Sequence, residues 1–125
     1  MYKEIEFAPP HSLILIMDPI LAIIPETMDS KLVVSTESCV AIGTRTPTDG
    51  PTHITLTDDP FPTTGFFLVF EGQLTAPSKR LAVCTTMSET LIEADLVRSR
   101  SHIKIWTNDQ MEPDDIRILL DTTSA

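Results

Sequence analysis

Residues 91–107, LIEADLVRSRSHIKIWT, decide the fold class of this chain. Apolar and polar residues alternate in the first arm, where Ile92 and Leu96 fall on one face. They alternate again in the second arm, where Ile103 and Ile105 share a face. A repeat of two is typical of half-buried β-strands. We therefore interpret the stretch as two strands that form a hairpin around a polar turn.

Strand patterns continue from this hairpin toward the N-terminus. Phe66–Phe70 is a run of five large apolar residues, which predicts a fully buried strand at the centre of the core. Leu13–Met17 is apolar on both faces and predicts a central strand covered on two sides. Residues 31–35 and 38–44 form either one long strand with a bulge or a tight hairpin. Shorter strands are expected over residues 3–7, 53–57 and 79–85.

Two segments are compatible with more than one structure. Ile20–Ile24 follows an Asp-Pro turn and forms either another strand or a single helical turn. The segment 114–121 begins with two acidic residues after a proline, as helices often do. Its isoleucines also alternate, and we favour a strand because the preceding segments are β.

These patterns together predict an all-β fold. About eight to ten short strands with regularly spaced turn signals are typical of an antiparallel β-sandwich, or of a partly open barrel. The length of 125 residues fits a single domain that spans 1–125. Free sheet edges in such a domain would also suit a homo-oligomer.

The chain is acidic, with a formal net charge of −9. That charge repels nucleic-acid backbones and suits a basic protein partner, although it serves solubility equally well. The most apolar region, 12–24, is interrupted by Asp18 and Pro19 and is too short to span a bilayer. It also lacks the basic start of a secretory signal. We expect a soluble, cytoplasmic protein that binds neither nucleic acid nor membrane.

The two cysteines, Cys39 and Cys84, lie in apolar strand patterns and belong to no paired motif. Free, buried thiols are expected at such positions in a reducing compartment. A disulfide between neighbouring strands is the alternative.

Motifs for catalysis and for cofactor binding are missing from the sequence. The three histidines lack metal-ligand spacing, no serine lies in a nucleophile motif, and the four glycines form no phosphate loop. We therefore expect a protein that is not an enzyme and has no metal or cofactor. The alternative is an enzyme whose site combines His53 with Asp58 and Asp59.

Basic residues gather in the turn and second arm of the expected hairpin. They would contact an anion or an acidic surface of a protein partner, or they would only offset Glu89, Glu93 and Asp95 across the ladder. Trp106 falls on the face opposite the two isoleucines, which favours an interface anchor and also suits a small ligand or carbohydrate. The candidate binding residues are Arg98, Arg100, His102, Lys104 and Trp106.

The C-terminal third resembles a known family. The segment 102–107, HIKIWT, is followed by an acidic loop and by a final I-x-I-x-x-D pattern at Ile116, Ile118 and Asp121. In this order the features are similar to those of the competence protein J family, whose members inhibit a DNA-uptake nuclease. The resemblance implies a cytoplasmic, non-catalytic protein that binds a protein partner, and it implies no catalytic residues.

Overall fold

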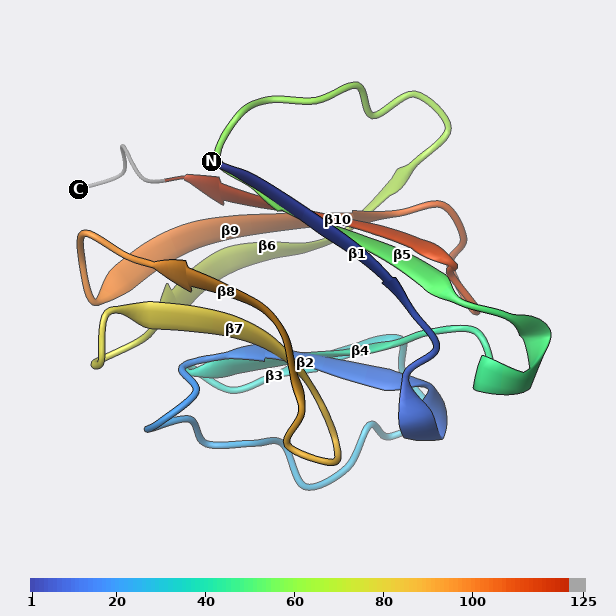
Figure 1. The fold of residues 1–125 in the computed structure, drawn as a ribbon, viewed down its shortest axis with the longest axis horizontal. Coiled ribbons are helices and arrows are strands. Elements are labelled where there is room, and N and C mark those ends of the chain that lie inside the picture. Colours follow the sequence, from blue (N-terminus) through green and yellow to red (C-terminus); the bar gives the residue numbers. More distant parts are fainter. Residues whose placement is uncertain (122–125) are drawn as a thin grey trace.

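The computed structural model describes residues 1–121, which form two β-sheets packed face to face (Figure 1). Two short 3-10 helices lie in the connections between strands. The elements in chain order are β1 (Tyr2–Phe7), η1 (Pro10–Ser12), β2 (Leu13–Met17), β3 (Val33–Ser35), β4 (Cys39–Gly43), η2 (Pro47–Asp49), β5 (Thr52–Thr57), β6 (Phe67–Thr75), β7 (Arg80–Thr85), β8 (Thr90–Asp95), β9 (Arg100–Thr107) and β10 (Asp115–Asp121).

Each sheet contains five of these strands. Sheet A has the order β1-β5-β10-β9-β6, and sheet B has the order β3-β4-β2-β7-β8. The strands described are paired antiparallel except β5 and β10, which run parallel. The expected all-β sandwich is confirmed. Its strands form two separate sheets, as a sandwich requires, and the one parallel pair, β5 and β10, is a detail that the strand patterns did not indicate. In residues 1–121 no helix is long and apolar enough to cross a membrane.

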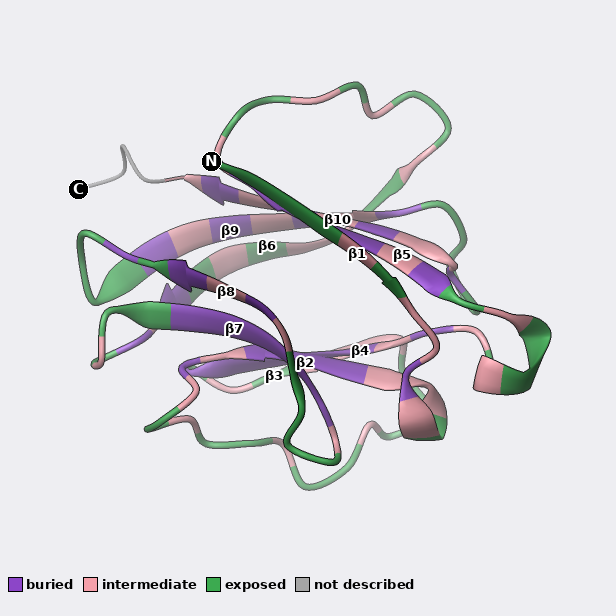
Figure 2. Ribbon diagram, in the orientation of Figure 1, coloured by how far each residue is buried: buried purple, intermediate pink, exposed green. Residues whose placement is uncertain are grey.

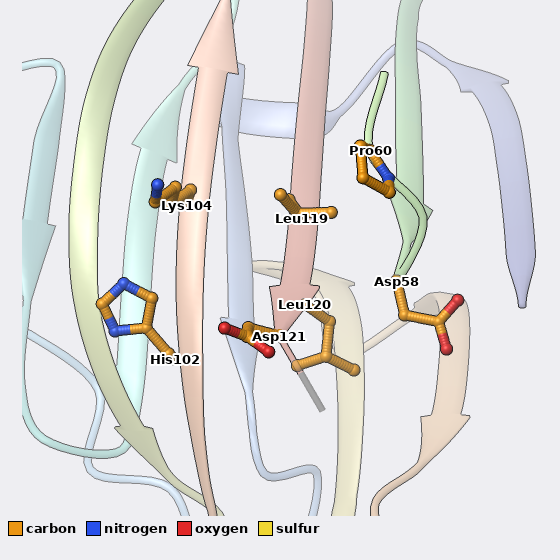
Figure 3. A pocket seen from close by; sticks show the side chains of 7 residues that line it. All are labelled: Asp58, Pro60, His102, Lys104, Leu119, Leu120 and Asp121. Atoms are coloured by element: carbon orange, nitrogen blue, oxygen red, sulfur yellow. The ribbon is translucent and has the colours of Figure 1, made fainter. Parts of the chain in front are cut away.

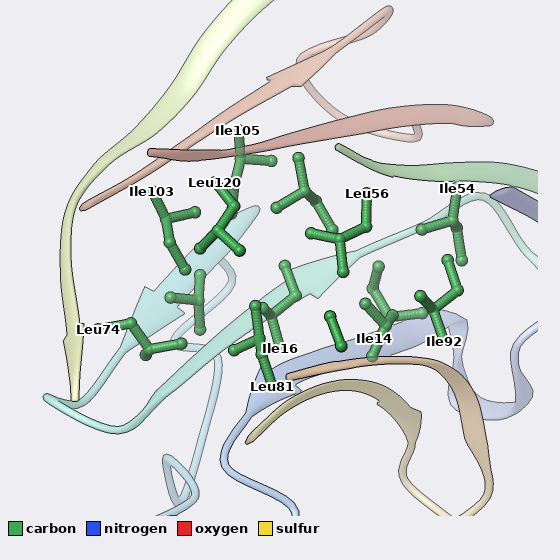
Figure 4. Packing of buried hydrophobic residues seen from close by; sticks show 14 of the residues in the cluster. Ile14, Ile16, Ile54, Leu56, Leu74, Leu81, Ile92, Ile103, Ile105 and Leu120 are labelled. Carbon is green, nitrogen blue, oxygen red and sulfur yellow. The ribbon is translucent and has the colours of Figure 1, made fainter. Parts of the chain in front are cut away.

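The core lies between the two sheets and consists of inward-facing isoleucine, leucine and valine side chains (Figure 4). Alternation along the strands places them there: Ile103 and Ile105 of β9 and Ile54 and Leu56 of β5 are fully buried. Burial of one such side chain stabilises the fold by roughly 1.5–3 kcal/mol. The inward faces predicted for the stretch 91–107 are therefore confirmed.

The hairpin predicted for that stretch is wrong, because β8 belongs to sheet B and β9 to sheet A. The connection between them crosses from one sheet to the other beside the connection from β6 to β7. Backbone bonds join the two crossings, from Ala76 N to Ser99 O at 2.6 Å and from Leu96 N to Lys79 O at 2.8 Å. Alternation is the same whether a strand turns back beside its neighbour or crosses to the opposite sheet, so the pattern could not distinguish the two.

The prediction that Phe66–Phe70 is the fully buried centre of the core is also wrong. Most of this run lies in β6, an edge strand of sheet A that pairs only with β9. Phe67 and Leu68 are 42% and 44% exposed. A bulge between Leu68 and Phe70 shifts the register there. An edge strand has one neighbour and a bulge reorients its side chains, so an apolar run there need not be buried.

Several other expectations are confirmed. β2 lies in the middle of sheet B, with Ile14 and Ile16 in the core and Leu15 in a second apolar cluster on the outer side. Residues 31–44 form the tight hairpin β3–β4, and residues 115–121 form strand β10. Both alternatives for Ile20–Ile24, a strand and a single helical turn, are wrong, because this segment is an irregular part of the connection from β2 to β3.

Both cysteines are free and buried, as expected. Cys39 is on β4 and Cys84 on β7, and β2 lies between these strands, so the alternative of a disulfide between adjacent strands is excluded. Burial is the main cause that raises the pKa of the Cys39 thiol to about 12, and the nearby Cys84 contributes.

Candidate protein-binding face

The outward-facing side of β9 brings together three of the five candidate residues. His102, Lys104 and Trp106 alternate with the buried isoleucines and point away from the core. We call these residues and their cross-strand neighbours the β9 face. The neighbours come from β10 and β6: Arg117 and Leu68 flank Trp106, Leu119 and Glu71 flank Lys104, and Asp121 and Gln73 flank His102.

Glu71 of the edge strand organises the charges of this face. Its Oε2 lies 2.9 Å from His102 Nε2 and 3.8 Å from Lys104 Nζ. All three side chains are partly exposed, so these contacts orient the groups more than they stabilise the fold. The face therefore presents a positioned mixture of cationic and anionic groups.

A hollow of about 340 Å³ opens beside His102 and Lys104 (Figure 3). Leu119 of β10 lies next to Lys104, and Pro60 approaches from the connection between β5 and β6. The hollow thus combines apolar side chains with both basic and acidic ones, and its size can accept one side chain of a partner. Its lining residues are Asp58, Pro60, His102, Lys104, Leu119, Leu120 and Asp121.

Arg117 of β10 holds the connection 58–66 over the outer side of sheet A. Its Nη1 donates to Pro62 O at 3.0 Å, and its guanidinium lies 4.0 Å from the centre of the Phe66 ring and 5.9 Å from that of Phe61. The sequence pattern did not single out this residue. Its alternation with Ile116 and Ile118 shows that it faces outward, but no local signal links it to rings more than fifty positions away.

The two arginines of the cluster lie at the end of β9. Arg98 is in the crossing connection and Arg100 is the first residue of β9, and both are exposed. Neither forms an ion pair with any residue of 1–121. Of the three acids that were expected to offset them, Glu93 and Asp95 instead contact Arg80 of β7, and Glu89 forms no ion pair with a residue of 1–121. That alternative is therefore wrong for Arg98 and Arg100, because β8 and β9 are not neighbours.

The alternative enzyme site is also wrong, because its residues lie apart. His53 is the second residue of β5 and Asp58 follows the end of that strand, so about 16 Å of extended strand separates them. His53 Nε2 lies 2.9 Å from Glu4 Oε2, and its Nδ1 lies 3.6 Å from Asp115 Oδ1. Asp58 contacts the Met1 amine at 2.9 Å. Asp59, the residue after Asp58, is equally remote from the imidazole.

The described residues hold no cluster of three or more His, Cys, Asp or Glu side chains arranged to bind a metal ion. The geometry of the chain thus defines an all-β sandwich with a polar, hollowed face on sheet A. No protein-family model matches the chain, and no curated protein sequence does either.

Solved structures share this fold. One is ComJ, inhibitor of the DNA degrading activity of NucA, from Bacillus subtilis, with a TM-score of 0.70 over 96% of this chain and 95% of that chain, at 12% identity. Another is "Crocagin biosynthetic gene J", with a TM-score of 0.61 over 99% of this chain and 98% of that chain, at 16% identity. The resemblance to ComJ expected from the sequence is confirmed at the level of the fold.

Proposed function

We propose that this chain is a non-catalytic, cytoplasmic protein that binds a protein partner through the β9 face and inhibits it, and that the partner is a nuclease. The observation that carries the proposal is the fold shared over nearly the whole chain with ComJ, an inhibitor of a DNA-degrading enzyme. The dispersal of His53, Asp58 and Asp59 supports a role without catalysis.

The β9 face, together with Arg98 and Arg100 beside it, has the chemistry of a specific interface. Arg98 and Arg100 form no ion pair with a residue of 1–121. An acidic group of the bound protein would form an ion pair with them. Trp106 is half-buried, with Arg117 and Leu68 as its cross-strand neighbours, so part of its side chain remains accessible. Tryptophan and arginine are the residues most often found as energetic anchors of interfaces.

The proposal is tested by capture from native lysate at low salt. We expect a stoichiometric complex whose second component degrades DNA only after high salt has dissociated it. Arg100→Glu should weaken the complex by about tenfold or more, because a favourable charge contact becomes repulsive. The matched control is Lys31→Glu, which makes the same charge change beside sheet B, and it should leave the affinity unchanged. Recovery of no stoichiometric partner, or of one without nuclease activity, would contradict the proposal.

A small ligand or carbohydrate is a second candidate because the hollow lies in the size range of ligand sites. Trp106, however, is not among the residues that line it, so a sugar in the hollow would have no aromatic ring to stack on. A thermal-shift screen with carbohydrates distinguishes the two candidates: stabilisation by a sugar, lost in Lys104→Ala, would favour this second function.

A further inference from the structure

The connection from β2 to β3 exposes a group of large apolar side chains. Ile20, Leu21, Ile23 and Ile24 are between 50% and 66% exposed. In Figure 2 much of this connection, which runs below β2 and β3, is coloured as exposed. Contiguous apolar side chains on the surface of a small acidic protein are typical of a binding site. We call residues 20–24 the apolar loop.

Polar anchors hold the backbone of the apolar loop in place. The carboxylate of Asp18, which is fully buried, accepts the N–H groups of Ile20, Leu21 and Ser78 at 2.8–3.0 Å. Ser38 Oγ accepts the N–H of Ile23 at 2.7 Å. The apolar side chains are therefore displayed outward by a backbone that is already ordered, which lowers the entropy lost on binding.

A hollow of about 350 Å³ adjoins the apolar loop on the outer side of sheet B. Leu15 and Ala41 of the central strands form its floor, and Ile24 and Met28 belong to its rim. The loop and the hollow together offer an apolar ridge beside an apolar depression. A partner segment with spaced apolar side chains could contact both at once.

Unpaired acids lie in the segments that form and anchor this apolar surface. Glu26 lines the hollow, while Asp29 and Glu37 lie in the same connection and in the β3–β4 turn that anchors it. All three are exposed, and none forms an ion pair with a residue of 1–121. Lys31 is the single cation of the sequence 18–38. Such a rim attracts cationic groups and repels both a second copy of this chain and an anionic lipid surface.

We propose that the apolar loop and its adjoining hollow bind a basic amphipathic segment of another protein, in which apolar residues alternate with lysine or arginine. The partner's apolar side chains pack on the ridge and in the hollow, and its cations meet Glu26, Asp29 and Glu37. This site lies on sheet B and does not depend on the proposed role of the β9 face on sheet A.

The test is a titration of the ¹⁵N-labelled chain, followed by NMR, with a synthetic peptide of leucines flanked by lysines. The matched peptide carries glutamates in place of the lysines. We expect the lysine peptide to shift the amide signals of residues 20–29 and to bind at least about tenfold more tightly than the glutamate peptide. Binding should weaken at about 1 M salt, because the ionic part is screened.

Two variants separate the apolar from the ionic contribution. Ile23→Asp should weaken peptide binding by about tenfold even though it adds a negative charge, because an exposed anchor is lost. Glu26→Lys should weaken binding of the lysine peptide and remove the preference over the glutamate peptide. Met111→Asp is the control, since Met111 is 81% exposed in the β9–β10 connection, and it should bind as the unmodified chain does.

Four results would overturn the proposal. Equal binding of the two peptides, or wild-type binding by Ile23→Asp, would show that the apolar loop is not a site for a basic amphipathic segment. Self-association in sedimentation that Ile23→Asp abolishes would assign the apolar loop to a second copy. Binding to phosphatidylglycerol vesicles that depends on Ile23 would assign it to a lipid surface.

Discussion

Asp18 is the buried polar group whose removal has the most sharply defined consequence. We consider Asp18→Asn, which preserves size and shape but replaces one carboxylate oxygen by an amide NH₂. The Oδ1 atom accepts two backbone N–H groups, from Ile20 and Leu21, and Oδ2 accepts the third, from Ser78. In the variant one oxygen continues to accept, while the NH₂ group faces a backbone donor. At least one buried N–H thus loses its acceptor.

The magnitude follows from these three contacts. The bonds that survive lose the strengthening that a charged acceptor gives, and the unpaired N–H retains its full desolvation cost. We expect the free energy of unfolding at neutral pH to fall by about 3 kcal/mol. For a chain of this length that corresponds to a lower melting temperature by roughly 10 °C. Asp95→Asn, which alters an exposed carboxylate, is the control and should cost less than about 0.5 kcal/mol.

The effect of Asp18→Asn depends on pH, and its sign is fixed. Burial by itself would raise the pKa of Asp18, but the N–H donors of Ser78, Ile20 and Leu21 outweigh burial and lower the pKa below its ordinary value of 3.8. The stability contributed by the carboxylate is therefore fully present above that value and is lost as the pH falls through the folded-state pKa. The difference in the free energy of unfolding between the unmodified chain and Asp18→Asn, measured by urea unfolding, should be smaller at about pH 2 than at neutral pH. A difference in the free energy of unfolding below about 1 kcal/mol at neutral pH, or a difference that is unchanged in acid, would refute this role of Asp18.

Three further predictions concern the core, the loop over sheet A and the thiols. Ile105→Ala should lower the free energy of unfolding by about 2–5 kcal/mol. Leu68→Ala, on the exposed edge strand, should lower it by less than about 1 kcal/mol. Comparable losses for the two variants in urea unfolding would contradict the assignment of β6 to an edge. Arg117→Ala should lower the free energy of unfolding by about 2 kcal/mol and speed amide exchange over residues 61–66, because the contacts with Pro62 O, Phe61 and Phe66 are lost; unchanged exchange would exclude that anchoring role. Because burial raises the pKa of Cys39 to about 12, this thiol should resist iodoacetamide in the native protein and react in denaturant; rapid alkylation under native conditions would show that Cys39 is accessible.

Local alternation predicted the inward faces of the strands well. The positions of Ile54, Leu56, Ile103 and Ile105 follow from a repeat of two, because side chains of an extended backbone point alternately to opposite sides. The strand at residues 115–121 followed from the same pattern. These features depend only on residues near one another in the sequence.

Sheet membership could not be predicted in the same way. β8 and β9 have the alternation of a hairpin, yet they belong to opposite sheets, because the crossing at Leu96 and Ser99 is fixed by bonds to Lys79 and Ala76. The run at Phe66–Phe70 looked central, since five apolar residues do not reveal how many neighbouring strands they will have.

The candidate site could be predicted only in part, because the sequence does not show which strands become neighbours. The outward orientation of His102, Lys104 and Trp106 followed from the strand pattern. Their cross-strand neighbours Glu71 and Arg117 come from strands that only the folded chain brings beside β9. The apolar loop was equally hidden, because exposure of Ile20–Ile24 depends on how the buried Asp18 anchors the backbone.

The most direct test of the central proposal is hydrogen exchange measured on the chain alone and in the complex captured at low salt. If the β9 face is the inhibitory surface, amides of residues 98–107 should be protected in the complex, and Arg100→Glu should remove both that protection and the inhibition of the nuclease. Protection confined to sheet B, or inhibition that Arg100→Glu leaves intact, would contradict the account.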